Sequence, residues 1–278
     1  MVAITSVGRF LCPKELHPVK KLLSSLATQV RIINALIMRE IMTRYGREGI
    51  GFLWLIAEPL GFCVGVIILW TVIKPEYEYG LRVAPFVMSG YMCLLLLRHI
   101  VGHSMTALQA NIGLLYHRKI TPLHIYISRA ILELAGATLA FIVVYTALLT
   151  LGQVSVPKNF LLLLSGWLTL AWLAFGLSMV MASLALRYDA VERMGNIIMY
   201  LMIPLSGAFI MAQYIPDSFR KYYLYIPFPH AVEMVRAGIW GEFVKTYYTP
   251  IYPIAFGAVL LFIGLLLLNV NRDHVETE

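Results

Sequence analysis

Charged residues are scarce in this sequence. Asp, Glu, Lys and Arg make up 13% of the 278 residues, and 60% of the residues are hydrophobic. A typical soluble domain carries about 25% charged residues. So little polar surface cannot cover a water-soluble globule. The composition therefore excludes an ordinary soluble domain and predicts an integral membrane protein.

Several motifs that support catalysis or cofactor binding are also missing. The three cysteines, Cys12, Cys63 and Cys93, are scattered and match no zinc spacing and no disulfide framework. There is no phosphate-binding G-x-x-x-x-G-K-[ST] loop and no G-x-S-x-G turn. His99 and His103 have the spacing of a metalloprotease pair, but the Glu that should follow the first His is absent. We therefore predict no catalytic residue, no metal site and no cofactor bound by this chain.

The formal net charge of +7 has a membrane explanation. On a soluble protein it would suggest nucleic acid. Here the segments that lie inside, if the N-terminus is inside, hold about twice as many Lys and Arg residues as the outer segments. This bias predicts that both termini are cytoplasmic, and it removes the reason to expect nucleic acid. About 50 mostly polar residues precede the first long apolar run, too many for the start of a cleavable signal peptide.

Six apolar runs are long enough to cross a bilayer as helices, which takes about 20 residues each. They cover residues 52–73, 83–107, 122–151, 160–186, 194–212 and 250–270. The prediction is an all-α membrane domain at 51–271 with six transmembrane helices. A cytoplasmic arm at 1–50 precedes it, and a cytoplasmic tail at 272–278 follows it.

Three further segments favour helices that do not span. In residues 20–45 apolar side chains recur at steps of three and four, which predicts an amphipathic helix on the inner membrane surface, on a soluble partner, or on both. Residues 111–121 resemble a short amphipathic cytoplasmic helix that stops before Pro122. The aromatic-rich stretch 213–249 predicts two short helices that dip into the outer leaflet or lie along it. An interfacial aromatic belt explains those aromatic residues equally well.

Four ionisable side chains interrupt the apolar runs: Glu58 in the first, and Arg98, His99 and His103 in the second. Unpaired charges at such depth are costly, so we expect Glu58 to pair with Arg98 or with one of the histidines. The group forms either a polar wall of a translocation path or a structural ion pair between two helices. The sequence G-F-C-V-G at 61–65 permits close helix approach, as at a dimer interface.

Three sequence motifs resemble those of ABC-2 type exporter permeases, and most closely the capsular polysaccharide export branch. The first is A-L-I-M-R-E-I-M-T-R-Y-G at 35–46, followed by G-F-L-W-L-I-A-E-P at 51–59. The second is Ala110-Asn111-x-Gly113-Leu114 with Thr121-Pro122, and the third is P-x-P-H-x-V-E-x-x-R at 227–236. The family commonly has Asn-Pro where this chain has Phe228-Pro229. The resemblance covers nearly the whole chain.

The resemblance implies a non-catalytic permease subunit of the bacterial inner membrane. It implies a homodimer with two ABC ATPase subunits, which would bind the ATP and Mg²⁺, and a channel between the protomers. It further implies a periplasmic polysaccharide co-polymerase, an outer-membrane export protein and a lipid-linked acidic polysaccharide as substrate. This agrees with the spans themselves, which lack the series of buried Asp and Glu residues of a proton-driven carrier.

The motifs and the buried polar groups together define three sets of candidate site residues. Those expected to couple to the ATPase are Arg39, Glu40, Arg44, Tyr45, Asn111, Leu114, Tyr116, His117 and Arg118. Those expected along the translocation path are Trp54, Glu58, Arg98, His99, His103 and Tyr200. Those of the re-entrant region outside the cytoplasm are Tyr225, Phe228, His230, Arg236 and Trp240.

Three other functions fit the same architecture. The nearest is export of an O-antigen, a teichoic acid or a small lipophilic drug, which the neighbouring genes would distinguish. A membrane-embedded enzyme that modifies lipids or sugars predicts turnover without an ATPase, and the missing catalytic motifs argue against it. A structural scaffold predicts no ATP-dependent export.

Overall fold

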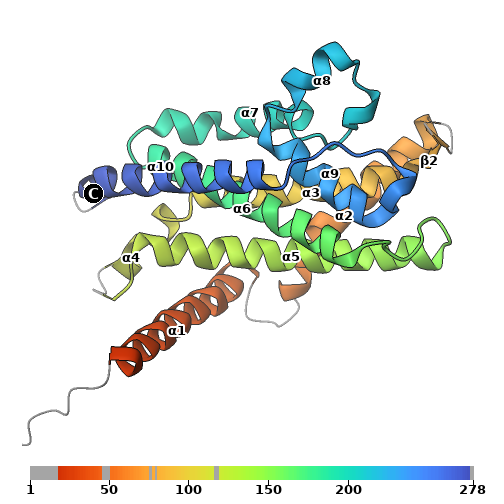
Figure 1. The fold of residues 1–278 in the computed structure, drawn as a ribbon. Helices are drawn as coiled ribbons and strands as arrows, with labels where there is room; N and C mark the ends of the chain where they lie inside the picture. The colour runs from red at the N-terminus through yellow and green to blue at the C-terminus, as the bar shows by residue number, and fades with distance from the viewer. Residues whose placement is uncertain (1–17, 46–50, 75–76, 79, 116–118, 276–278) are drawn as a thin grey trace, which may run out of the picture.

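The computed structural model describes residues 18–45, 51–74, 77–78, 80–115 and 119–275. Almost all of the regular structure is helical (Figure 1). The long helices are α1 (Pro18–Tyr45), α2 (Gly51–Ile73), α3 (Val83–Met105), α5 (Pro122–Thr150), α6 (Phe160–Ala185), α7 (Asp189–Leu205) and α10 (Ile251–Val275). The short elements are β1 (Tyr77–Glu78), β2 (Leu81–Arg82), η1 (Gln109–Asn111), α4 (Ile112–Leu115), η2 (Ala212–Tyr214), α8 (Asp217–Tyr223), α9 (Pro227–Trp240) and η3 (Gly241–Phe243). Strands β1 and β2 form an antiparallel hairpin.

Within the described residues, five helices are long and apolar enough to cross a membrane. They contain the segments Leu53–Ile73, Val83–Met105, Pro122–Thr150, Phe160–Ala185 and Ile251–Asn271. These agree with five of the six predicted runs to within two residues at each end. These five helices were predicted from the length of uninterrupted apolar sequence, which can be read directly from the residues.

The predicted span at 194–212 is not confirmed as a spanning helix. Helix α7 covers its first part but has only 17 residues, with Asp189 and Glu192 in its first turn. At 1.5 Å per residue it is about 26 Å long, shorter than a hydrocarbon core of about 30 Å. The helix ends at Leu205, just after Pro204, and Gly207 then adopts a positive φ of 78°. The apolar run therefore continues beyond α7 in irregular backbone, and the sixth predicted span is not confirmed.

Helix α6 is the centre of the bundle and packs against α10, α9 and α3. Small residues bring α6 and α10 together: a Cβ on Gly176 would lie 2.8 Å from the Gly257 carbonyl oxygen. Three hydrogen bonds between described residues join the same helices: from Ser183 to the Gly264 carbonyl, from Asn271 to the Ser183 carbonyl, and from Trp172 Nε1 to the Ile254 carbonyl. The polar side chains of Ser183 and Asn271 are thus satisfied where they are buried between the two helices, as a membrane interior requires.

The two ends of the bundle have separate apolar clusters. Helix α1, the turn before η1, the start of α5 and the ends of α6 and α10 meet in a cluster that includes Leu36, Leu108, Tyr126 and Leu268. At the opposite end Leu81 and other residues join the hairpin to the start of α3 and to Val244. Helix α1, α4 and the C-terminal end of α10 therefore lie at one end of the bundle (Figure 1).

Helix α2 remains largely uncovered within the single chain. Its exposed apolar side chains are Leu53, Trp54, Phe62, Ile68, Leu69, Val72 and Ile73. Nothing in the described part of the chain lies within 4 Å of a Cβ placed on Gly61 or Gly65. The close helix approach predicted from this glycine pair is therefore not made inside the protomer.

Candidate functional site

The predicted coupling residues meet where helix α1 crosses the short helices before α5. Arg39 of α1 donates a hydrogen bond to the side-chain oxygen of Asn111, although 72 positions separate them. Asn111 is buried, and its amide nitrogen donates to the Ala107 carbonyl at 2.7 Å. One asparagine thus connects the arm to the backbone at the end of the second span.

A second link joins α1 to α5. Glu40 Oε1 lies 3.0 Å from Arg129 Nη1, and both side chains are largely buried. One turn earlier His124 contacts the side chain of Gln29. His124 also accepts the Thr121 backbone N–H at 3.0 Å and so closes the capping box that starts α5. The N-terminus of α5 is therefore fixed to its own turn and to α1 by the same histidine.

Apolar packing surrounds these polar links. Leu36 of α1 is buried against Leu108, Ile125 and Leu268, with Leu114 of α4 partly buried at the edge. We call this assembly of α1, the 107–115 segment and the start of α5 the inner clasp. Its hydrogen bonds, ion pair and apolar contacts make it a single packed unit, since buried interiors transmit displacement with little compression.

The structure brings together Arg39, Glu40, Asn111 and Leu114 of the predicted coupling set, and it adds Gln29, His124 and Arg129. Gln29 and Arg129 had no motif to mark them. The side chains of Arg44 and Tyr45, and residues Tyr116, His117 and Arg118, lie outside the described residues. Their predicted roles stay predictions.

A second polar group lies between α3 and α5, deep in the spanning region. Glu133 of α5 is only 2% exposed. Its Oε1 lies 2.8 Å from His103 Nδ1, and its Oε2 lies 3.8 Å from His99 Nδ1. The two imidazole rings are 5.4 Å apart on one face of α3. A single carboxylate therefore faces both histidines at about 16 Å along α5 from its first residue.

The sequence had offered Glu58 and not Glu133 as the carboxylate of this group. In the described chain no ion pair joins Glu58 to Arg98, and Glu58 interacts electrostatically with His99. Arg98 instead lies over the ring of Tyr200 in α7, with 5.1 Å from its guanidinium carbon to the ring centroid. Glu133 was visible as the one acidic residue inside the run 122–151, a signal that sequence analysis did not use.

Trp54 and Tyr200, both predicted along the path, are 66% and 60% exposed within the protomer. Trp54 is on α2, and Tyr200 is on the exposed face of α7 together with Ile197 and Leu201. Both aromatic rings therefore point away from the core of this chain, toward whatever covers α2 and α7.

Helix α9 explains the P-x-P-H-x-V-E-x-x-R motif. Arg236 is completely buried and donates to the carbonyls of Gly207, Ala208 and Ile210. Its guanidinium also lies over the ring of Phe86 at 4.7 Å. These contacts hold the irregular backbone that follows α7, where carbonyl groups have left the helix and need donors.

Glu233 and His230 bind two further loops from the same helix. The Glu233 carboxylate accepts the N–H groups of Ala212 and Tyr247 and lies 3.9 Å from Arg236. Burial raises the pKa of Glu233, and Arg236 and the two N–H groups partly offset that rise. His230 Nδ1 accepts the Thr249 N–H at 3.0 Å, so its Nε2 carries the proton that it donates to the Leu224 carbonyl at 2.9 Å.

The two short helices predicted in 213–249 exist as α8 and α9, but their placement along a leaflet is not confirmed. Helix α9 is buried within the protein, with Phe228 and the motif residues inside and Trp240 at its partly exposed end. Tyr225, just before α9, is 72% exposed. The partners of Glu233 and Arg236 come from the segments at 207–212 and 247, which the sequence pattern of α9 cannot reveal.

The bundle and its sites define the class of protein before any comparison is made. Apolar helices of spanning length surround buried polar links, and the described residues contain no group of His, Cys, Asp or Glu that could hold a metal. The helices are those of a multi-pass membrane protein.

Comparison with known proteins identifies the family. Residues 31–240 match the ABC-2 type transporter family. A capsule polysaccharide export inner-membrane protein, CtrC, of Neisseria meningitidis serogroup A is 38% identical over 95% of this chain and its own full length. The protein of that description from Haemophilus influenzae, BexB, is 34% identical over 91% of this chain and 96% of its own length.

A more distant relative is the polysialic acid transport protein KpsM of Escherichia coli, 26% identical over 92% of this chain and 99% of its own length. The chain therefore belongs to the ABC-2 type transporter family. The predicted resemblance to capsular polysaccharide export permeases is confirmed, and the named relatives support a multi-pass inner-membrane location.

Proposed function

We propose that this chain is the membrane subunit of an ATP-driven exporter that moves a lipid-linked capsular polysaccharide across the bacterial inner membrane. It works as a homodimer with two separate ATPase subunits, which bind ATP and Mg²⁺, and both of its termini are cytoplasmic. The names and full-length similarity of the Neisseria and Haemophilus relatives support the substrate class. A periplasmic co-polymerase and an outer-membrane export protein carry the polymer onward.

The observation that carries the mechanism is the inner clasp. The ATPase contacts the membrane subunit at η1 and α4, which lie at the clasp end of the bundle. A displacement there reaches Asn111, and Asn111 passes it to Arg39 of α1. The ion pair of Glu40 with Arg129 passes it on to α5. Two polar links therefore make α1 and α5 move with the nucleotide-dependent contact.

The displacement of α5 has a consequence inside the membrane. Arg129 and Glu133 are four residues apart, so they lie one above the other on one face of α5. A shift that starts at Glu40 and Arg129 therefore moves the carboxylate that faces His99 and His103 of α3. The polar contacts between α3 and α5 thus change with the state of the ATPase.

The path itself lies between two copies of the chain. Helices α2 and α7 each have an apolar and aromatic face that the protomer leaves exposed, including Trp54 and Tyr200. Aromatic rings suit the apolar faces of sugar rings, and Arg98 behind Tyr200 supplies positive charge for an acidic polymer. A dimer that brings these faces together encloses a conduit, whereas a monomer leaves them in contact with lipid.

The experiment that tests this function uses a strain lacking the gene, together with the purified complex. Restored surface polysaccharide on complementation, and loss of it when the partner ATPase is inactive, are the expected results. In the complex, Asn111→Ala should leave ATP hydrolysis in place but reduce export at least about fivefold. A fivefold change corresponds to the lower end of typical coupling free energies between two sites. Arg31→Ala is the matched control, because Arg31 is exposed on the same helix α1.

Two outcomes would contradict the proposal. Turnover of a lipid or sugar by the purified chain without an ATPase would indicate an enzyme. Export of an O-antigen or teichoic acid, with capsule unaffected by deletion, would keep the transporter but overturn its substrate.

A further inference from the structure

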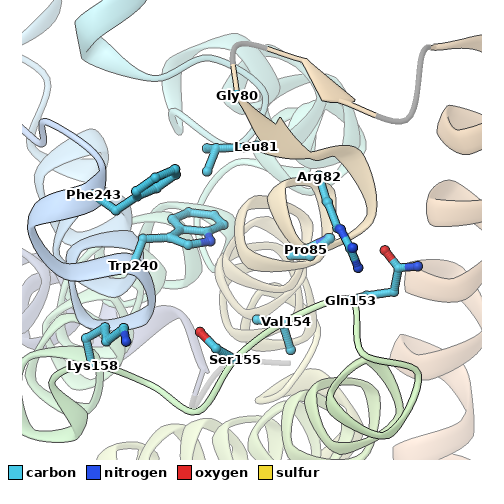
Figure 2. A pocket seen from close by; sticks show the side chains of 10 residues that line it. All are labelled: Gly80, Leu81, Arg82, Pro85, Gln153, Val154, Ser155, Lys158, Trp240 and Phe243. Atoms are coloured by element: carbon cyan, nitrogen blue, oxygen red, sulfur yellow. The ribbon is translucent and has the colours of Figure 1, made fainter.

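A cavity of about 310 Å³ opens at the end of the bundle opposite the inner clasp. Hairpin residues 80–82, Pro85 of α3, the loop between α5 and α6, and the end of α9 form its walls (Figure 2). Because α3 begins at Val83 and α5 ends at Thr150, the cavity lies at or beyond the outer ends of the spanning segments. Its volume is at the lower end of the range for small-ligand sites, about 300–1,000 Å³.

The walls of the cavity are fixed to one another by hydrogen bonds. Arg82 Nη1 donates to the Gly152 carbonyl at 2.6 Å, which ties the hairpin to the loop after α5. The Tyr145 hydroxyl donates to the Ser155 carbonyl at 2.8 Å, and the Asn159 N–H donates to the Gly238 carbonyl at 2.9 Å. The loop is therefore held to α5 and α9, so the cavity is formed before any ligand arrives.

The side chains around the cavity combine three kinds of binding group. Trp240 and Phe243 lie on one wall, and Arg82 and Gln153 lie on the other, with Ser155 and Lys158 at its edge (Figure 2). None of the lining residues that the structure describes is acidic. The Lys158 ammonium suits a carboxylate, and the Arg82 guanidinium, which also holds the Gly152 carbonyl, adds positive charge to the same cavity. The amide and the hydroxyl suit sugar hydroxyl groups, and an indole face suits the C–H groups of a pyranose ring.

We infer that this cavity binds one acidic sugar unit of the exported polymer as it leaves the membrane. The inference rests on the proposed function and adds a binding site outside the conduit between protomers. A phosphate alone would use the cations but would leave the aromatic wall and the two neutral polar groups without a role. An acidic sugar uses all three, and binding here would hold the emerging chain beside the exit while the next segment moves.

The test measures binding to the full chain in nanodiscs of phosphatidylcholine. The probes are a hexasaccharide of sialic acid, a hexasaccharide of glucuronic acid and the neutral maltohexaose. We expect at least one acidic probe to bind about tenfold more tightly than the neutral one. Lys158→Gln should remove most of that difference, since one charge-assisted hydrogen bond accounts for about a tenfold change.

Lys245→Gln is the matched control, because Lys245 is an exposed lysine that lies over Tyr247 and does not line the cavity. Phe243→Ser is a second test variant: its ring is 76% exposed, so the substitution should not disturb folding. It should weaken the acidic probes and the neutral one in equal measure, because the aromatic wall contacts the ring and not the charge.

Three results would overturn the site. They are the absence of saturable binding by either acidic probe, equal affinity of the Lys158→Gln and Lys245→Gln proteins for the acidic probes, and a Lys158 effect that appears only as altered binding of phosphatidylglycerol in a parallel set of nanodiscs that contain this lipid. The last would identify a lipid headgroup site. If any of these results is found while ATP-dependent capsule export remains intact, the sugar site is refuted and the proposed function still stands. If capsule export continues in a strain that lacks this chain, the proposed function is refuted independently of the site.

Discussion

The carboxylate of Glu133 lies 2.8 Å from Nδ1 of His103, and together they join α5 to α3 within the spanning region. His99 approaches the other carboxylate oxygen at 3.8 Å. Glu133 is 2% exposed, whereas the His103 side chain is 34% exposed. The carboxylate is thus the buried member of the pair, and its environment depends on where the histidines lie.

Glu133→Ala should destabilise the protein more than His103→Ala does. Removing the carboxylate leaves both imidazole rings without their partner within the spanning region, and each unsatisfied buried polar group costs about 1–3 kcal/mol. His103 is partly exposed, so its loss should cost less. Thermal unfolding of the purified chain in one detergent measures both. The double variant should be less destabilised than the sum of the single ones, with a coupling of about 0.5–3 kcal/mol. Strict additivity would show that the two side chains do not interact.

The sequence alone could not assign Glu133 its partners. The periodicity of α5 places the residue on a helix but does not say which helix faces it, because that depends on how α3 packs. Depth along the helix pairs Glu58 with Arg98, because Glu58 is about 10 Å and Arg98 about 13 Å from the inner end of its apolar run. Two helices bring a pair of side chains together only if both the depth of each residue and the rotation of each helix about its axis are right. In a span that is apolar on all sides, the hydrophobic pattern says little about that rotation.

Reversing the charge of either member of the ion pair between Glu40 and Arg129 should abolish export, and reversing both should restore part of it. Glu40→Arg places two cations at a largely buried contact, and Arg129→Glu places two carboxylates there. The double reversal recovers opposite charges at the same place. Surface polysaccharide and ATP hydrolysis measured together distinguish uncoupling from loss of protein.

Arg31→Glu serves as the control for this swap, because it reverses an exposed charge on the same helix. We expect it to leave export within about twofold of the unchanged protein, as surface charges contribute little. A double reversal no better than the worse single reversal, with protein levels equal, would show that the contact does not transmit the signal.

Arg236→Lys should destabilise the protein although it keeps the charge. Arg236 serves three carbonyl groups at once, and a lysine ammonium cannot reproduce the geometry of the guanidinium. We expect a loss of about 2–4 kcal/mol, because buried carbonyls and Glu233 lose partners. Thermal unfolding measures it. Lys221→Arg, at an exposed site of α8, should have no effect. An unchanged unfolding temperature for Arg236→Lys would mean that the carbonyls of 207–210 are satisfied in another way.

The end of α7 shows a second limit of prediction from sequence. Residues 194–212 are mostly apolar, with Asn196 and Ser206 as the polar exceptions, so the pattern predicts a helix that continues to Ala212. The structure ends the helix at Leu205 because Arg236, far along the chain, binds the carbonyls that a turn at Gly207 exposes. In contrast, the amphipathic helix α1 followed from its own periodicity and needed no distant partner.

Gly61→Cys should form a disulfide between two copies of the chain in native membranes. Gly61 has open space around it in the protomer and lies on the uncovered face of α2, which the proposed dimer must cover. The substitution is made in a chain with Cys12→Ser, Cys63→Ala and Cys93→Ala, and mild oxidant followed by non-reducing electrophoresis detects the dimer. Val259→Cys, exposed on α10, is the control and should stay monomeric because no partner is proposed there. Equal cross-linking at both sites would reflect random collision in the membrane, and cross-linking at Val259 alone would place the dimer contact on α10.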